Sequence, residues 1–181
     1  MNKARNPLPP RVREVNIGVL NNTVADLFGL YVRTKQMHWN GRGTSFVGLR
    51  KLLGDFAART MNYIDRAAER ATTFGGTVED PLRESMSHSQ LKKQTAASSI
   101  GGMSGWIHEL AEVHAACTRH VRAAIQKLPA AENFGTADLL TDIVRDLDFQ
   151  CRLLKAHINQ RKTAKKTEDT SRSYERTRFC S

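Results

Sequence analysis

The chain has 181 residues, of which 40% are hydrophobic and 25% are charged, and its formal net charge is +10. This length suits one domain with a sizeable core, and no apolar run approaches the roughly 18–20 residues that a membrane span needs. The N-terminus lacks the apolar segment of a secretory signal, and the three cysteines are an odd number without metal-ligand spacing. The composition favours a globular protein of a reducing cytoplasm.

The positive charge is concentrated at the two ends of the chain. Residues 1–14 carry four basic residues against one acid, giving +3, and residues 161–181 carry seven against three, giving +4. Such ends are typical of flexible tails that bind a polyanion, although tails that only aid solubility would have the same composition. We expect a domain over residues 15–160 between two basic tails. The candidate DNA-binding residues are Lys3, Arg5, Arg11, Arg13, Lys162, Lys165, Lys166, Arg172, Arg176 and Arg178.

Apolar residues at steps of three and four predict four long helices within the domain. The apolar stripes span residues 17–31, 46–74, 106–128 and 139–158. His38 lies at the end of the first helical pattern, and Gly75 and Gly76 end the second. Thr136 is a plausible N-cap for the fourth helix. No segment shows the sustained period-two pattern of a strand, so an all-α bundle is expected.

The connections between these helices differ in length. The first pair and the last pair are joined by short loops, Asn40–Thr44 and Pro129–Gly135, whereas the middle connection runs from Gly75 to about Gly102. A long middle crossover is the topology of ferritin-like four-helix bundles rather than of up-down-up-down bundles. Within it, MSHSQLKKQ is a candidate short helix. The sequence therefore predicts a ferritin-like bundle.

Two carboxylates of the second helix are candidates for metal binding. Asp65 and Glu69 are four residues apart, which places their side chains on one helix face about 5–6 Å apart at Cβ. Hard oxygen pairs suit Fe(II), and an imidazole such as that of His38 would complete a mixed site. On composition alone, however, the stretch Asp-Arg-Ala-Ala-Glu-Arg is more often a solvated helix face, and a single histidine more often has a structural role.

Three stretches resemble the signature of the Dps family of miniature ferritins: residues 35–40, 48–56 and 65–76. The resemblance covers roughly residues 15–160. It implies a hollow homododecamer that oxidises and sequesters iron (Fe2+/Fe3+) and binds DNA without sequence preference, in the cytoplasm and associated with the nucleoid. In that family the ferroxidase site lies at a two-fold subunit interface. One subunit supplies two histidines and an acid, and its mate supplies an acid pair.

The resemblance assigns roles to individual positions. His38 matches the first histidine, while Asp65 and Glu69 match the acid pair of the mate. Trp39 matches the aromatic residue beside the iron site, where it could be a redox-active neighbour; a core or interface tryptophan is the alternative. Asp138 matches an acid that lines the three-fold pore, and Asp142 adds to it one turn later. The alternative for Asp138 is compensation of the helix dipole.

Two expected ligand positions are altered. Arg50 stands at the second histidine, and arginine only donates hydrogen bonds, so it cannot ligate a cation. Gly54 stands at the acid, and Asp55, one residue further on, is turned away by about 100°. We therefore expect ferroxidase activity that is weakened or lost, with Arg50 pairing across the interface with Asp65 or Glu69 of the mate.

Other functional interpretations remain open. One is an active ferroxidase and iron store that oxidises Fe(II) with hydrogen peroxide or oxygen through the three remaining ligands. Another is a non-catalytic DNA-binding shell, or a subunit that assembles together with a competent paralogue. A third is a plain helical adaptor that never forms a cage.

Overall fold

The structure, a computed structural model, describes residues 8–42, 46–78, 80, 102–128 and 134–178, with side chains described from 104 onward in the third of these helices and up to 158 in the last. It has four helices: α1 (Pro10–Asn40), α2 (Phe46–Thr73), α4 (Gly102–Lys127) and α5 (Phe134–Arg178). No strand occurs in these described ranges. The predicted all-α bundle is confirmed, while the candidate short helix MSHSQLKKQ lies outside the described residues.

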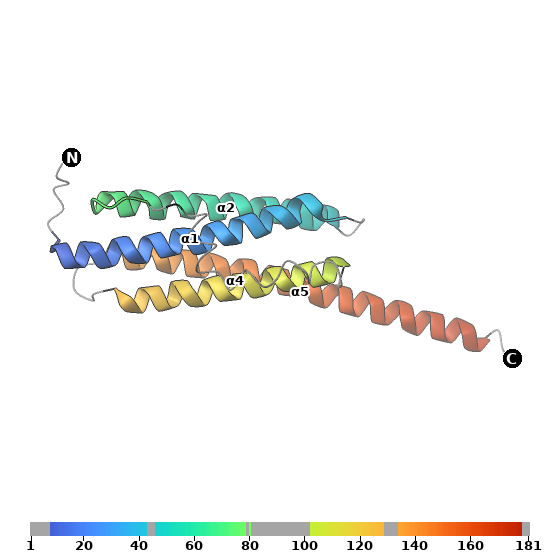
Figure 1. Ribbon diagram of the computed structural model, residues 1–181. Helices are drawn as coiled ribbons and strands as arrows, with labels where there is room; N and C mark the ends of the chain where they lie inside the picture. Colours follow the sequence, from blue (N-terminus) through green and yellow to red (C-terminus); the bar gives the residue numbers. More distant parts are fainter. Residues whose placement is uncertain (1–7, 43–45, 79, 81–101, 129–133, 179–181) are drawn as a thin grey trace.

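The helices pack as two antiparallel pairs. α1 packs along α2, α4 packs along α5, and α1 also packs on α4 (Figure 1). α2 and α4 run in the same direction (Figure 1), as a long crossover between them requires. This arrangement confirms the predicted ferritin-like topology with a long middle crossover. None of the helices in the described part of the chain is long and apolar enough to cross a membrane.

The core is built from the predicted apolar stripes. One large side chain after another is fully buried along each helix, including Leu20, Leu27, Leu53, Phe56, Ile107, Leu140, Ile143, Leu147 and Leu154. Cys117 and Cys151 are also buried, as expected for small structural thiols, and burial raises the pKa of the Cys117 thiol. The helix faces that meet in the core are therefore those that the spacing predicts.

Two glycines end α2 as predicted. Gly75 has φ 82°, in the left-handed region that glycine adopts without strain. The Gly76 N–H then donates to the Ala71 carbonyl at 3.1 Å, which satisfies one of the last carbonyls of the helix. A side chain at Gly76 would meet Ile17 of α1 at 2.7 Å, so this turn also lets the chain pass close to α1.

Both ends of the bundle differ from the expected boundaries. α1 begins at Pro10, so residues 10–14 are helical rather than part of a tail; proline is favoured in the first turn because its missing N–H is not needed there. α5 has 45 residues and continues to Arg178, past residue 160 where the tail was expected to begin. It projects beyond the ends of the other helices (Figure 1). Residues 161–178 contain neither glycine nor proline and are rich in good helix formers, which accounts for the extension.

The start of α5 is also earlier than predicted. α5 begins at Phe134, so Thr136 lies within its first turn and is not the N-cap. The Thr136 side chain is buried, and its Oγ1 accepts a hydrogen bond from Arg70 Nε of α2 at 2.8 Å. Gly135 makes room for this contact, because a Cβ there would lie 2.6 Å from the Arg70 guanidinium. Thr136 thus ties α5 to α2.

Candidate metal centre

His38 lies in the last turn of α1 and is partly buried against α2. Its Nδ1 is buried and has no hydrogen-bond partner among the described residues. Burial lowers the pKa of His38, and the positive charges of Lys35 and Arg50 lower it further. The imidazole is therefore neutral at pH 7, which is the form that can ligate a metal.

Gly54 of α2 faces the imidazole of His38. A Cβ on Gly54 would lie 3.6 Å from His38 Nε2, at ordinary van der Waals distance. The side chain of an aspartate at position 54 would therefore lie next to His38 Nε2, but glycine provides no metal-ligating atom there. Asp55 is exposed, as expected for a residue rotated by about 100° from Gly54.

Arg50 lies one turn before Gly54 on α2 and is exposed. Its effect on the His38 pKa shows that the guanidinium lies near enough to act electrostatically on the imidazole. A cation bound at His38 would feel the same repulsion, because like charges a few ångströms apart disfavour each other. The ligand set within one chain is therefore one imidazole, one empty position and one positive charge, which does not fit a two-iron centre.

Asp65 and Glu69 do not approach His38 in the same chain. Both are exposed on α2, and Asp65 follows Gly54 by 11 residues, which is about 16 Å along a helix. No three His, Cys, Asp or Glu side chains in the described ranges come together as a metal site. A site that combines His38 with this acid pair consequently needs a second copy of the chain.

Trp39 is not a core residue. Its side chain is 68% exposed, and the Lys35 ammonium lies 5.2 Å from the centre of its ring. Val47, at the start of α2, is 75% exposed. The exposure of Trp39 rules out the interpretation as a core residue. Two large exposed apolar side chains at this end of the α1–α2 pair are consistent with the interpretation of Trp39 as an interface residue.

The two pore candidates have different surroundings. Asp142 is partly buried and lies 3.7 Å from Arg66 of α2 and 3.4 Å from Arg145 of α5. Asp138 is exposed. Because α5 begins at Phe134, Asp138 lies beyond the first turn, where the helix dipole has little effect. The dipole alternative for Asp138 therefore loses its basis, and its role at a pore stays a prediction.

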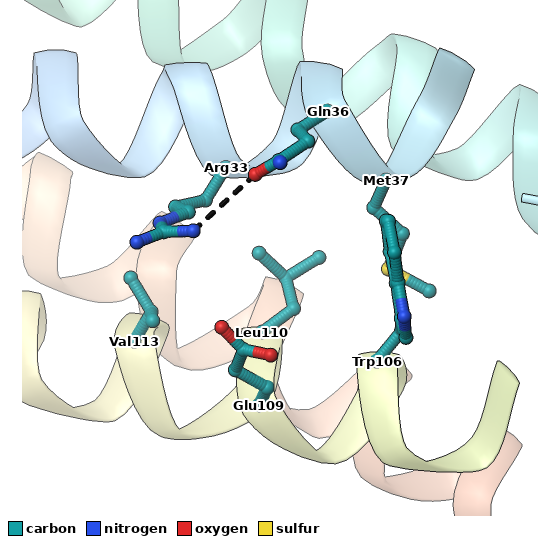
Figure 2. A pocket seen from close by; sticks show the side chains of 7 residues that line it. All are labelled: Arg33, Gln36, Met37, Trp106, Glu109, Leu110 and Val113. Carbon is teal, nitrogen blue, oxygen red and sulfur yellow. Dashed lines mark hydrogen bonds between the residues drawn. The ribbon is translucent and has the colours of Figure 1, made fainter. Parts of the chain in front are cut away.

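A pocket on another side of α1 is distinct from the His38 region. It lies between α1 and α4, with Met37 beside Trp106 and with Arg33, Gln36 and Glu109 at its rim (Figure 2). Its cavity of about 30 Å³ has room for only one or two water molecules. This pocket is too small for an organic ligand and contains none of the predicted metal ligands.

Sequence reasoning missed a buried polar chain in the middle of the bundle. His114 of α4 and Gln150 of α5 are fully buried, and Asp146 is 7% exposed. Arg59 of α2 reaches this chain and lies 3.2 Å from Asp146 Oδ1. The signal was present: Asp146 and Gln150 lie at core positions between the apolar residues Ile143 and Leu154. A search for apolar spacing passes over polar residues at such positions.

The predicted DNA-binding residues are described only in part. Arg11 is exposed on α1, whereas Arg13 is partly buried, with a buried Nε that has no hydrogen-bond partner among the described residues. Arg13 is therefore less accessible than a tail residue would be. Lys3 and Arg5 lie outside the described residues. The helical backbone of α5 carries the remaining candidates, from Lys162 to Arg178.

The sequence and the fold of the chain match those of known proteins. The model of the ferritin-like domain matches residues 17–164, so the chain is a ferritin-like protein. The DNA protection during starvation protein of Agrobacterium fabrum is 32% identical over 159 residues, which cover 88% of this chain and 97% of that protein. Within the ferritin-like class, the chain belongs to the Dps family.

Solved structures agree with this assignment. DpsC from Streptomyces coelicolor has a TM-score of 0.75 and 27% identity, covering 83% of this chain and 87% of that chain. Dps from Microbacterium arborescens in the high iron form has a TM-score of 0.71 and 25% identity, covering 83% of this chain and 97% of that chain. The family model ends at residue 164, so most of the α5 extension lies beyond the ferritin-like domain.

Proposed function

We propose that the protein is a DNA-binding and iron-sequestering shell whose ferroxidase activity is weakened or lost. The observation that carries the second part is the juxtaposition of Gly54 with His38 Nε2, because it leaves a ligand position empty beside the one histidine. The high iron form of the Microbacterium arborescens relative supports iron as the cargo of the shell. The shell is a homododecamer in this proposal, as the family resemblance implies.

Arg50 has a structural role at the interface in this proposal. Its guanidinium takes the place of a bound cation and pairs with Asp65 or Glu69 of a second copy of the chain. The exposure of all three residues in a single chain supports this, since each is accessible to a neighbouring copy. Bidentate contacts between guanidinium and carboxylate are strong enough to hold such an interface in register. A shell that also contains a competent paralogue would gain active sites from the other subunit.

A second candidate is an active ferroxidase with a reduced ligand set. The lowered pKa of His38 favours it, because a neutral imidazole is available to ligate iron. Three protein ligands with open positions can hold a single iron, and His38, Asp65 and Glu69 are three. Trp39 would then be the redox-active neighbour. The charge of Arg50 opposes iron binding in this arrangement, so it is the less favoured candidate.

DNA binding in this proposal depends on the C-terminal part of α5. Residues 161–181 carry seven basic residues against three acids, a charge of +4. Residues four apart lie on one side of a helix, and three basic pairs have this spacing: Arg161 and Lys165, Lys162 and Lys166, and Arg172 and Arg176. A projecting helix with this spacing presents basic residues to phosphates as a group. Twelve copies on one shell would convert weak contacts into tight, sequence-neutral binding to the nucleoid.

Deletion of residues 161–181 tests the DNA-binding proposal. We expect the shortened shell to lose DNA retardation at low salt, because it loses the +4 segment from every subunit. The matched control deletes only residues 179–181, which carry no charged side chain, and should retard DNA as the full chain does. Light scattering on both proteins establishes that the dodecamer persists. Retardation that is unchanged in the 161–181 deletion would show that another surface binds DNA.

A further inference from the structure

The buried hydrogen-bonded chain of His114, Gln150 and Asp146 needs an unusual number of hydrogens to complete its hydrogen bonds. His114 Nδ1 lies 2.8 Å from the Leu110 carbonyl, and His114 Nε2 lies 3.0 Å from the Gln150 side-chain oxygen. The Gln150 side-chain nitrogen donates to Asp146 Oδ2 at 2.8 Å. Of these contacts, the one between His114 and Gln150 links α4 to α5 inside the core, where an unmade hydrogen bond is costly.

The number of hydrogens follows from the groups themselves. A carbonyl oxygen only accepts, so His114 Nδ1 has to carry a hydrogen for Leu110. The Gln150 amide donates from its nitrogen and accepts at its oxygen, so it supplies a hydrogen to only one of its two neighbours. With the amide oriented as described, His114 Nε2 has to donate as well, and the ring is an imidazolium.

If the Gln150 amide is turned so that its nitrogen and oxygen exchange places, the additional proton is needed at Asp146 instead of at His114. The Gln150 nitrogen would then donate to His114 Nε2, and the ring would be neutral. The Gln150 oxygen would face Asp146 Oδ2, which would need a proton of its own to complete the third hydrogen bond. In both orientations the side chains of His114, Gln150 and Asp146 together hold one proton more than they would with a neutral imidazole and an ionised carboxylate.

We propose that the His114–Gln150–Asp146 chain retains one shared proton at neutral pH and that its loss at higher pH loosens the contact between α4 and α5. With the proton present, all three hydrogen bonds form. Without it, two acceptors face each other within 3.0 Å at one of the contacts. The core of the bundle therefore contains a hydrogen-bonded contact between α4 and α5 whose strength depends on pH.

The surroundings of the chain define which groups act on it. Arg59 of α2 lies 3.2 Å from Asp146 Oδ1, and burial together with the charges of Asp146 and Asp142 raises the pKa of Tyr63 on the same helix. Phe56 of α2 presents its ring at 6.0 Å from that of His114 and is not ionisable. Asp146 is the one charged group of the described residues that acts on His114, so the shared proton belongs to these two residues.

The position of the proton is set by opposing effects. Burial lowers the pKa of His114, whereas its hydrogen bonds to Leu110 and Gln150 and the charge of Asp146 raise it. The net lowering of the His114 pKa favours a neutral ring, with the Gln150 amide turned so that its nitrogen donates to His114 Nε2. Arg59, whose side chain is 52% exposed, lies 3.2 Å from Asp146 Oδ1, and solvent screens this ion pair.

Spectroscopy on the assembled wild-type protein at neutral pH tests the proposal directly. We expect either the carbonyl stretch of a protonated carboxyl, assigned by its absence in Asp146→Asn, or the nitrogen NMR signature of a doubly protonated His114 ring. One of the two has to be present at neutral pH. A neutral ring together with an ionised Asp146 would overturn the proposal.

The pH dependence of unfolding provides a second test. Above about pH 7 the unfolded chain has released both protons, while the folded chain retains one, so stability has to fall as the pH rises. The folding equilibrium constant should decrease tenfold per pH unit, until the folded chain releases the proton. In Asp146→Asn the new amide donates to the Gln150 oxygen, so this contribution to the slope should vanish. Asp148→Asn, an exposed acid two residues away, is the matched control and should keep it. Parallel slopes for the wild type and Asp146→Asn would contradict the proposal.

Discussion

The double variant Arg50→His/Gly54→Asp is expected to oxidise Fe(II) at least about 10-fold faster than the wild type, on the scale by which metal-site substitutions change affinity or activity. Histidine at position 50 removes a positive charge and adds a ligand. Aspartate at position 54 fits, because its Cβ would lie 3.6 Å from His38 Nε2 without a clash. The measurement is the initial rate of Fe(II) oxidation with hydrogen peroxide under anaerobic conditions.

Single variants and a displaced variant serve as controls for this gain. Arg50→His and Gly54→Asp alone should each produce a smaller gain, since each leaves one altered position in place. Lys51→His adds an imidazole at an exposed neighbouring position, about 100° around the helix, and should leave the rate unchanged. If Lys51→His/Gly54→Asp were as fast as the designed pair, the assignment of position 50 to the metal site would be wrong.

Phe56→Ala is expected to lower the free energy of unfolding by about 3–5 kcal/mol. Phe56 is 1% exposed and packs edge-on against the His114 ring, so its removal leaves a cavity in the middle of the bundle. The measurement is equilibrium denaturation at a fixed protein concentration, because the stability of an assembled shell depends on concentration.

The matched control for the core makes the same chemical change at the surface. Phe134 is 79% exposed, so Phe134→Ala should change the free energy of unfolding by no more than about 0.5 kcal/mol. Comparable losses in the two variants would mean either that Phe56 is not a central core residue or that Phe134 is covered in the assembled shell. Repeating the comparison under dissociating conditions separates these outcomes.

The bundle itself was predictable because the spacing of apolar residues and the glycines that end a helix are local signals in the sequence. The steps of three and four residues fixed which helix faces are buried, and Gly75 and Gly76 end α2 through backbone contacts that the residue type indicates. The extension of α5 was missed for a physical reason. The sequence of residues 161–178 contains no apolar stripe, yet their backbone is helical because they contain no helix breaker.

The residues of the candidate metal centre stay a prediction from the sequence, and the structure adds their environment. The approach of Gly54 to His38 agrees with the position that the family resemblance assigns to a ligand. The lowered pKa of His38 depends on how Lys35, Arg50 and the surface of α2 surround the ring, which spacing along the chain does not encode. The group of His114, Gln150 and Asp146 was missed because His114 lies 36 residues before Gln150 and all three residues lie within apolar patterns.

The rate of peroxide-dependent Fe(II) oxidation by the wild-type shell, compared with its His38→Ala variant, tests the central claim most directly. The claim is that Arg50 and Gly54 leave His38 without the ligands that a working ferroxidase site requires. We predict a slow reaction that the His38→Ala variant reproduces. A fast wild-type reaction that is lost on replacing His38 would contradict the claim and establish the reduced ligand set as an active site.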